Sequence, residues 1–293
     1  MKILILAILI AAISAEELLV TQEYTDYLKK HVSWEVVDYE ENVFRGWTVE
    51  EASLLLGDSE SDYVPEGVAI KADTNLPASI NWQGANCIHE IHNQGSCGSC
   101  WAFATASVAS DLCCLQNKDY GWLSPQELVS CDKKNGGCNG GLAATGLEYV
   151  KTNGLVPEAC YPYLARGEAC PNKCKDGSDW ASAHVCKCKE LVDCGTLPLM
   201  KTCLKDGPIT VRMLVYSDFF NYKSGIYCWD HSSTFRGGHA IRCIGYGEGA
   251  KPYLRCANSW GPSWGDMGYF NISVEDGCGI RLTAHDAWSV KGC

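Results

Sequence analysis

Hydrophobic positions predict three helices in the middle of the chain. Residues 100–116 contain neither glycine nor proline and are apolar around most of a helical circumference, which is typical of a buried helix beginning near Cys100. A second helix is expected to start at Ser124, an N-cap residue followed by a proline and, at the third helical position, a glutamate. A third helix is expected to end at Gly154.

The pattern changes after about Asp193. Runs of β-branched and aromatic residues, bounded by Gly, Pro and Asn, predict strands within residues 208–216, 237–247, 252–261 and 268–274. The sequence therefore predicts an α+β fold of two lobes, one helical over about 88–183 and one β-rich over about 184–290.

Residues 1–15 have the pattern of a signal peptide. A lysine precedes an apolar run that is too short to span a bilayer, and small residues follow at Ser14 and Ala15. We expect the signal to be cut after one of these two residues. A membrane anchor is the alternative interpretation.

Residues 16–75 differ in composition from the rest of the chain. They contain no cysteine, are acidic, and include two short helical patterns, at 25–34 and 48–57. We interpret this part as a pro-segment that is removed ahead of a domain at 76–293. A small N-terminal domain that stays attached is the alternative.

Charge and cysteine content narrow the classes of function. The 293 residues carry a formal net charge of −11, which argues against nucleic acid or an anionic membrane as partner. All 19 cysteines lie between Cys87 and Cys293, and a secretory route favours disulfides over metal sites at the close pairs Cys170/Cys174 and Cys186/Cys188. Because the number is odd, at least one cysteine is unpaired or pairs outside the chain. If one is a nucleophile, up to nine bridges remain.

The stretch "QGSCGSCWAFA" contains two cysteines, Cys97 and Cys100. Such a pair can be a redox couple, half of a zinc site, or a nucleophile beside a structural cysteine. Cys100 opens the predicted helix, where the helix dipole and free amides are expected to depress the thiol pKa. A backbone amide of the same turn and the Gln94 side chain could form an oxyanion hole.

Among the seven histidines, His239 is the candidate for chemistry. It lies in an apolar, strand-like run behind Gly237 and Gly238, which leave room for a substrate backbone. The side-chain oxygen of Asn258, 19 residues later, could accept the imidazole N–H, and Trp260 could shield that bond. The "HEIH" stretch at residues 89–92 lacks the spacing of a zinc-protease helix and is interpreted as surface.

Together these stretches resemble the papain-like cysteine peptidases, in particular the branch that includes cathepsin B. The resemblance covers about residues 76–290 and includes "LPASINW", "QGSCGSCWAFA", "GCNGG", "GGHAI" and "NSWGPSWG" in the expected order. It implies a papain-like fold with a helical left lobe, a barrel-like β right lobe and a cleft between them. The pro-segment resembles the short cathepsin B type.

The resemblance also assigns roles. It implies that Cys100 is the nucleophile, His239 the acid–base, Asn258 its orienter and Gln94 the oxyanion donor. It implies disulfides Cys97–Cys138, Cys131–Cys170 and Cys87–Cys114. The implied substrate-binding residues are Gly98, Asn139, Gly140, Gly141, Gly238, Trp260, Trp264 and Arg281.

The sequence departs from cathepsin B at two places. After "YPY" (161–163), where cathepsin B has an occluding loop with paired histidines, the stretch is short and has no histidine pair. We therefore expect an open cleft and endopeptidase action. Arg281 stands where cathepsin B has a glutamate at the floor of the S2 pocket. It is expected to repel a basic P2 residue and to leave room for an acidic or apolar one, unless it points to solvent.

The sequence thus predicts a secreted or lysosome-like cysteine endopeptidase made as a zymogen. Expected partners are peptide and protein substrates, the pro-segment as inhibitor, and cystatin-like inhibitors. We expect a monomer with no cofactor, and a glycosylation sequon begins at Asn271. The alternatives are a catalytically silent homologue that acts as a binding or matrix protein and, less favoured, a thiol–disulfide oxidoreductase.

Overall fold

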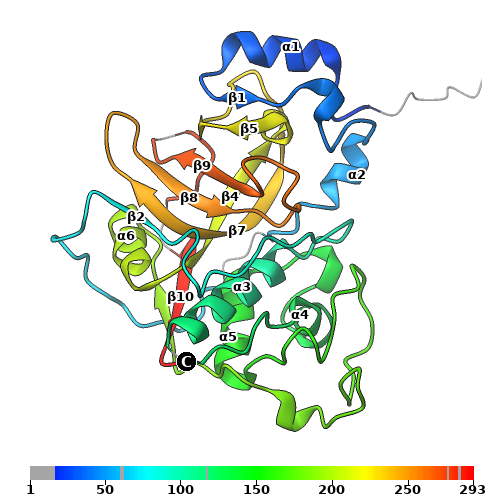
Figure 1. Ribbon diagram of the computed structural model, residues 1–293, viewed down its shortest axis with the longest axis vertical. Helices are drawn as coiled ribbons and strands as arrows, with labels where there is room; N and C mark the ends of the chain where they lie inside the picture. The colour runs from blue at the N-terminus through cyan, green and yellow to red at the C-terminus, as the bar shows by residue number, and fades with distance from the viewer. Residues whose placement is uncertain (1–16, 60–62, 117, 276, 283–284) are drawn as a thin grey trace, which may run out of the picture.

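Helix α3 (Cys100–Leu115) lies between the β-sheet on one side and two shorter helices on the other (Figure 1). The computed structural model describes residues 17–293 except 60–62, 117, 276 and 283–284. Every residue of α3 from Cys100 to Cys114 is buried, because the helix has apolar or small side chains on all sides. The predicted buried helix is confirmed.

The helical lobe contains two further α-helices, α4 (Pro125–Cys131) and α5 (Ala143–Asn153). The Ser124 side chain accepts the backbone N–H of Glu127 and so caps α4 as predicted. Gly154, at φ +78°, ends α5 in a conformation that favours glycine. Two short 3₁₀ turns lie in the connections of this lobe, η2 (Gly137–Asn139) between α4 and α5 and η3 (Ala181–Ala183) after α5.

The β lobe is built on a sheet with strand order β3-β10-β4-β7-β8-β9-β6, and β2 pairs with β7. Neighbouring strands are antiparallel except β6 and β9. The four predicted strands correspond to β4, β7, β8 and β9. The bounds are β2 Ser79–Asn81, β3 Glu190–Asp193, β4 Ile209–Tyr216, β6 Ile226–Tyr227, β7 Phe235–Gly247, β8 Tyr253–Ala257, β9 Tyr269–Ser273 and β10 Ala287–Lys291.

The sequence reasoning missed helix α6 (Leu197–Asp206), which packs beside β4 and β7. Its start, Thr196 followed by a proline in the first turn, is a helix signal within a region otherwise typical of strands. A 3₁₀ turn, η4 (Ser217–Asn221), and strand β5 (Tyr222–Ser224) complete the lobe.

The division between the lobes is less simple than the expected boundary near residue 184. Leu191 of β3, Trp288 and Val290 of β10, and Cys186 just before β3 pack in the core of the helical lobe. The disulfide Cys188–Cys293 joins the end of the chain to this region. Strand β10 therefore contributes to both lobes, because it pairs in the sheet and covers α5.

The N-terminal segment packs on the β lobe at the top of Figure 1. It contains α1 (Gln22–His31), β1 (Glu35–Val36), η1 (Tyr39–Glu41) and α2 (Val49–Ser53), so both predicted helical patterns are helices. Strand β1 pairs with β5, and buried side chains of the segment join the core of the β lobe: Leu28, Trp34, Phe44 and Leu55. The predicted signal peptide at 1–15 lies outside the described residues.

Nine disulfides cross-link the described chain, and Cys100 is its one unpaired cysteine. The three predicted pairs, Cys97–Cys138, Cys131–Cys170 and Cys87–Cys114, are confirmed. The cysteines considered as metal ligands each belong to a disulfide. This density of disulfides fits the oxidising environment of the secretory route.

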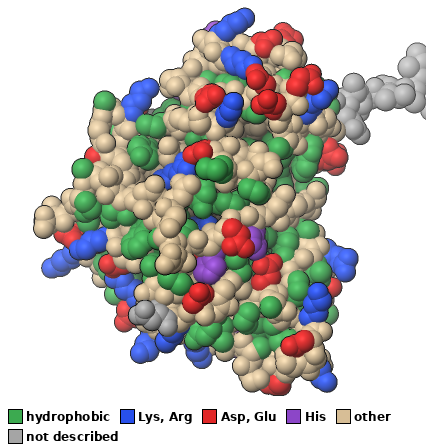
Figure 2. Space-filling model, viewed as in Figure 1, with side chains coloured by type: hydrophobic (Ala, Val, Ile, Leu, Met, Phe, Trp, Pro, Cys, Tyr) green, Lys and Arg blue, Asp and Glu red, His purple; other side chains and the backbone are tan. Residues whose placement is uncertain are grey.

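Two features concern possible partners: the distribution of charged side chains on the surface, and the length and apolar character of the helices. Among the residues drawn in colour in Figure 2, acidic and basic side chains alternate over both lobes, and histidines group near the middle of this face. Within the described part of the chain, no helix has the length and apolar character needed to cross a membrane.

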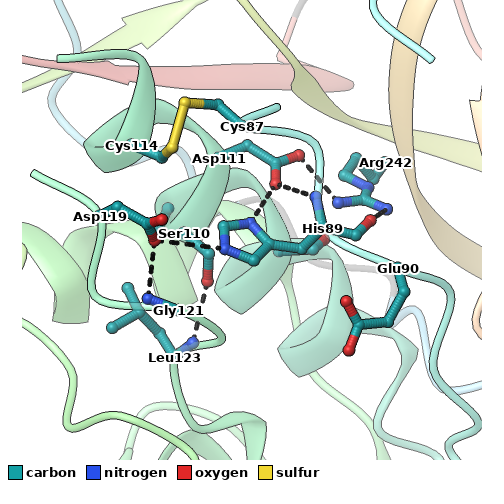
Figure 3. Close-up of polar contacts among 12 residues, drawn as sticks. Cys87, His89, Glu90, Ser110, Asp111, Cys114, Asp119, Gly121, Leu123 and Arg242 are labelled. Atoms are coloured by element: carbon teal, nitrogen blue, oxygen red, sulfur yellow. Dashed lines mark hydrogen bonds and ion pairs between the residues drawn. A yellow bond between two sulfur atoms is a disulfide. The ribbon is translucent and has the colours of Figure 1, made fainter. Parts of the chain in front are cut away.

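An ion pair between α3 and β7 braces the two lobes (Figure 3). Arg242 of β7 donates to Asp111 of α3 at 2.8 Å, and both side chains are almost completely buried. The His89 ring contacts the other oxygen of Asp111 at 2.8 Å, and the His89 carbonyl accepts from Arg242. The interpretation of residues 89–92 as surface is wrong for His89, because its side chain completes this buried network and is 13% exposed.

We expect Arg242→Met to lower the free energy of unfolding by about 3 kcal/mol, because it leaves the Asp111 carboxylate buried without its cation. Urea-induced unfolding with the disulfides intact measures this change. Lys134→Met is the matched control, since Lys134 pairs with Glu148 at the surface and should contribute less than about 1 kcal/mol. Equal losses for the two variants would contradict the role of the brace.

Candidate active site

Cys100 is the first residue of α3 and is fully buried in this structure. Its Sγ lies 3.5 Å from the backbone nitrogen of Ala240, the residue after His239 on β7. The indole N–H of Trp101 donates to the Gly137 carbonyl and fixes the first turn of α3 against η2. The helix start and the strand thus bring Cys100 and His239 together from opposite lobes.

Asn258 orients the His239 ring. His239 Nε2 lies 2.7 Å from Asn258 Oδ1, which also accepts the backbone N–H of Ser259 at 2.8 Å. Because Oδ1 is an acceptor in both bonds, the proton is on Nε2, and Nδ1 remains as the nitrogen that can take a proton. The Trp260 ring lies 5.0 Å from the His239 ring, centroid to centroid, and is 5% exposed, so it screens this bond from water.

Gln94 points its amide nitrogen toward the cleft. Nε2 donates to the carbonyls of Leu55 and Cys97 at 3.0 and 2.8 Å. Its Oε1 accepts the hydroxyl of Ser259 at 2.6 Å, which fixes the orientation of the amide. The sequence reasoning missed Ser259, although a hydroxyl directly after Asn258 is a visible signal.

Residues 55–59 cross the site, and we call them the strap. The Gly57 carbonyl accepts the N–H of Gly141 at 2.9 Å, and the Ser59 N–H donates to the Gly141 carbonyl at 3.0 Å. The Asp58 N–H donates to the Gly238 carbonyl at 3.2 Å. The strap therefore takes up backbone hydrogen bonds on both sides of the cleft.

Glycines make this close approach possible. A Cβ at Gly57 would lie 2.0 Å from the Gly98 carbonyl oxygen, and one at Gly238 would lie 2.8 Å from the Asp58 carbonyl oxygen. Gly140, at φ +110°, would bring a Cβ to 2.9 Å from Ser59 Oγ. Gly98, Gly140 and Gly238, which were singled out in the sequence, thus form the walls of a narrow channel for extended backbone.

Of the other predicted substrate-binding residues, Asn139 lies beside the strap and Trp264 lies in the core of the β lobe. Asn139 lines a hollow with Ser59 and Tyr63, next to the strap. Trp264 is 2% exposed and packs among Phe219, Tyr222, Trp260 and Phe270, so it is a core residue of the β lobe and is not exposed to the cleft. Its placement corrects the expectation for this residue, since the second tryptophan of "NSWGPSWG" turns inward.

Arg281 and Arg212 lie at the end of the strap. The Nε of Arg281 is 3.2 Å from Asp286 Oδ1, and the Arg281 side chain is 31% exposed, so it is paired and does not simply point to solvent. Arg212, on β4, contacts Asp58 of the strap at 2.8 Å. The sequence reasoning missed Arg212, whose signal is an arginine within an otherwise apolar strand.

Burial governs the protonation of the pair beneath the strap. Burial raises the pKa of the Cys100 thiol to about 12 and lowers the pKa of His239 to about 4. The expected depression of the Cys100 pKa is therefore wrong for this state. The helix start still favours a thiolate, but the strap excludes the water that would stabilise the charged form. Both groups are neutral at pH 7 with the strap in place.

The two-lobed fold and this site define a class, the cysteine proteases of the papain type. Residues 76–287 match the family described as papain family cysteine protease. Because the match extends over most of the chain, the protein belongs to the papain family of cysteine proteases.

Its relatives place it near cathepsin B. The chain is 36% identical to Cathepsin B-like CP3 of Giardia intestinalis over 257 residues, 81% of this chain and 84% of the relative. It is 32% identical to Cathepsin B of Dictyostelium discoideum over 235 residues, 74% of each. Among solved structures, proCathepsin B S9 from Trypanosoma congolense superposes with a TM-score of 0.79 at 27% identity, covering 94% of this chain and 99% of that one. The chain is therefore cathepsin B-like and matches a proform.

We expect Gly57→Ala to displace the strap and expose Cys100, because the added Cβ would overlap the Gly98 backbone. Iodoacetamide should then alkylate Cys100 of the full-length chain about tenfold faster or more at pH 7, since the thiol regains water and a lower pKa. Peptide mapping by mass spectrometry measures the rate. Gly167→Ala is the control, because a Cβ there meets nothing within 4 Å. An unchanged rate in Gly57→Ala would show that the strap does not control Cys100.

Proposed function

We propose that this protein is a cysteine endopeptidase of the cathepsin B type, made as a latent precursor. One observation carries the proposal. Cys100, His239, Asn258 and Gln94 converge at one point of the cleft, and the Gln94 amide that would bind an oxyanion is occupied by the carbonyl of Leu55. This arrangement is the one expected of a protease whose own chain occupies the substrate position.

In the proposed reaction, Cys100 is the nucleophile and His239 carries the proton. Once the strap has left, the thiol gives its proton to Nδ1 of His239, and the thiolate attacks the carbonyl carbon of the substrate. The C–N bond breaks as the imidazolium protonates the leaving amine. Water then hydrolyses the thioester with His239 as base. Gln94 Nε2 stabilises the carbonyl oxygen while it bears negative charge.

We propose that residues 16–75 are the inhibitory pro-segment and that cutting before about Leu76 activates the enzyme. The apolar side chains of this segment anchor it on the β lobe, and the strap fills the cleft. Acid by itself is not expected to release the strap through Asp58. Burial raises the pKa of Asp58 to about 6, so protonation of Asp58 favours the docked state as the pH falls, and this contribution is lost as the pH rises through 6. Proteolysis is therefore the proposed activating step.

The remaining expectations follow from the proposed route. A signal at 1–15 and nine disulfides support a secreted or lysosome-like enzyme. We propose that it acts as a monomer on peptides and proteins and is open to cystatin-like inhibitors. The rival proposal, a silent homologue that acts as a binding protein, is disfavoured because the candidate nucleophile, base and orienter are all present.

An epoxide inhibitor of papain-like enzymes should label Cys100, because it is the one cysteine of the described residues that is not in a disulfide. We expect label and peptide hydrolysis to appear after limited proteolysis of the full chain near residue 76 and to be nearly absent before it. Cys100→Ala should abolish both, whereas His231→Ala, at an exposed histidine of the domain that remains after processing, should change neither. A processed chain that folds but neither binds the inhibitor nor cuts peptides would support the silent homologue.

The loop after Tyr163 bears on the mode of cleavage. It is held to the helical lobe by Cys131–Cys170 and Cys160–Cys174. From α4, the Gln126 side chain accepts the Leu164 N–H at 2.8 Å and donates to the Arg166 carbonyl at 2.9 Å. Because this loop stands in place of the occluding loop, its attachment to the helical lobe supports a cleft that is open on the side that binds residues after the cleaved bond.

We therefore expect the activated enzyme to cut internal bonds of peptides blocked at both ends. It should remove C-terminal dipeptides poorly, because no histidine pair in this loop is available to bind a terminal carboxylate. Mass spectrometry of the products from blocked and free-ended peptides distinguishes the two modes. Efficient release of C-terminal dipeptides would contradict the endopeptidase proposal.

A further inference from the structure

The hydroxyl of Tyr163 joins two segments that flank the candidate nucleophile. It donates to the Gln94 carbonyl at 2.7 Å, and Ser99 Oγ lies 2.6 Å from the same hydroxyl oxygen. Because a phenol has one proton and a carbonyl can only accept, that proton goes to Gln94, and the Ser99 hydroxyl donates to Tyr163. One oxygen atom thus binds both the candidate oxyanion donor and the residue directly before Cys100.

The Tyr163 hydroxyl is fixed in both position and protonation. Its ring packs edge-on against Phe103 near the start of α3, with the ring centroids 4.6 Å apart. Burial raises the pKa of Tyr163 to about 12, with the Ser99 hydrogen bond opposing the rise and a negative charge on Cys100 adding to it. The hydroxyl therefore remains a donor to Gln94 whether Cys100 is a thiol or a thiolate.

Hydrogen bonds from both lobes hold Gln94. Ser259, just after β8, binds it twice: the Ser259 carbonyl accepts the Gln94 N–H at 2.8 Å, and the hydroxyl donates to Oε1 at 2.6 Å. The Gln94 amide donates to the Cys97 carbonyl, which orients the side chain but does not hold the backbone. Among the described residues, Tyr163 is the partner of the Gln94 carbonyl. Without its hydroxyl, Ser259 of the β lobe would hold the Gln94 backbone alone, whereas Cys100 belongs to the helical lobe.

An oxyanion site leaves little room for movement of its donors, because each must lie about 2.7–3.1 Å from the developing charge. In the proposed site one donor is the Gln94 amide, and the other is a backbone N–H of the first turn of α3. Ser99 directly precedes that turn, and its side chain makes no capping bond with the helix. Its hydroxyl binds Tyr163 instead. The phenol therefore links the segments that carry the two donors.

We propose that Tyr163 is a positioning residue of the oxyanion site, which holds the Gln94 backbone in register with the helix start that carries Cys100. The inference rests on the proposed function and adds to it a residue from the connection after α5. Tyr163 acts through Gln94 and not on the substrate. Its effect falls on the chemical step, because negative charge develops on the carbonyl oxygen only as the thiolate attacks.

The first test is Tyr163→Phe in the full chain activated by limited proteolysis, with the concentration of active enzyme taken from epoxide titration of Cys100. We expect kcat and kcat/KM for an amide substrate to fall together by about 10-fold, a part of the roughly 100- to 1,000-fold that one oxyanion donor contributes. KM should stay within about twofold, since ground-state binding is not touched. A raised KM with kcat unchanged would overturn the proposal.

A double-mutant cycle with Gln94→Ala shows whether Tyr163 acts through Gln94. Gln94→Ala by itself should lower kcat by about 100-fold or more. Adding Tyr163→Phe should then change kcat by less than about twofold, because the amide that Tyr163 positions is already gone. If Tyr163→Phe lowers kcat by the same factor in both backgrounds, or if Gln94→Ala leaves kcat unchanged, the assignment is wrong.

Tyr161→Phe is the matched control. Tyr161 lies two residues earlier in the same connection, and its hydroxyl also has two partners, Ser130 Oγ at 3.0 Å and Glu168 Oε1 at 2.8 Å. Because neither partner adjoins Cys100 in the sequence or carries a proposed donor, kcat should stay within about twofold, whatever the variant loses in stability as a buried hydrogen bond is removed. An equal fall of kcat in Tyr161→Phe and Tyr163→Phe would attribute the effect to general loosening of the lobe and overturn the proposal.

Epoxide titration of Cys100 separates this inference from the proposed function. If the unsubstituted enzyme titrates and cuts peptides but Tyr163→Phe keeps its kcat, the positioning role is wrong and the protease proposal stands. If no sites titrate and no peptide is cut, the proposed function fails first. Should Tyr163→Phe not fold, Ser99→Ala decides, because it removes the other bond of the phenol. It should lower kcat, and an unchanged kcat there would overturn the proposal.

Discussion

The contact between α3 and β7 is the junction on which the active site depends. At one end, the start of α3 brings Cys100 against the backbone that follows His239. Eleven residues further along the helix, Asp111 binds Arg242, three residues after His239. The proposed catalytic pair and the buried brace therefore belong to the same two elements. A shift of the lobes that broke the ion pair would also move the thiol relative to the imidazole.

Water exclusion would explain how the proposed catalytic residues can be inactive in the precursor and reactive afterwards. The strap buries Cys100 and His239, and burial favours the neutral thiol and the neutral ring. The orientation of the site is already complete, because Asn258 and Ser259 hold the ring and the Gln94 amide without the strap. Activation would then need removal of a cover and little rearrangement of the residues beneath it.

Much of this could be predicted from the sequence, where the signal is local. The apolar helix after Cys100, the cap at Ser124 and the strands around His239 agree with the structure. The three disulfides that the family resemblance implies also agree with it. The errors are also informative. Trp264 and His89 were misplaced because a tryptophan in a glycine-rich loop, or a histidine between acidic and apolar residues, can face either way until its neighbours are known.

The sequence by itself determined the family and the spacing of the candidate reactive groups. It also determined that the N-terminal segment differs in composition from the rest of the chain. Short-range patterns and residue types are enough for these. Only the tertiary structure decided the protonation of Cys100, the course of the strap and the meeting of Asp58 with Arg212, which are 154 residues apart. The reason is physical. A pKa depends on solvent access, and the partner of a charge depends on which distant segments pack together, so neither can be assigned from local sequence.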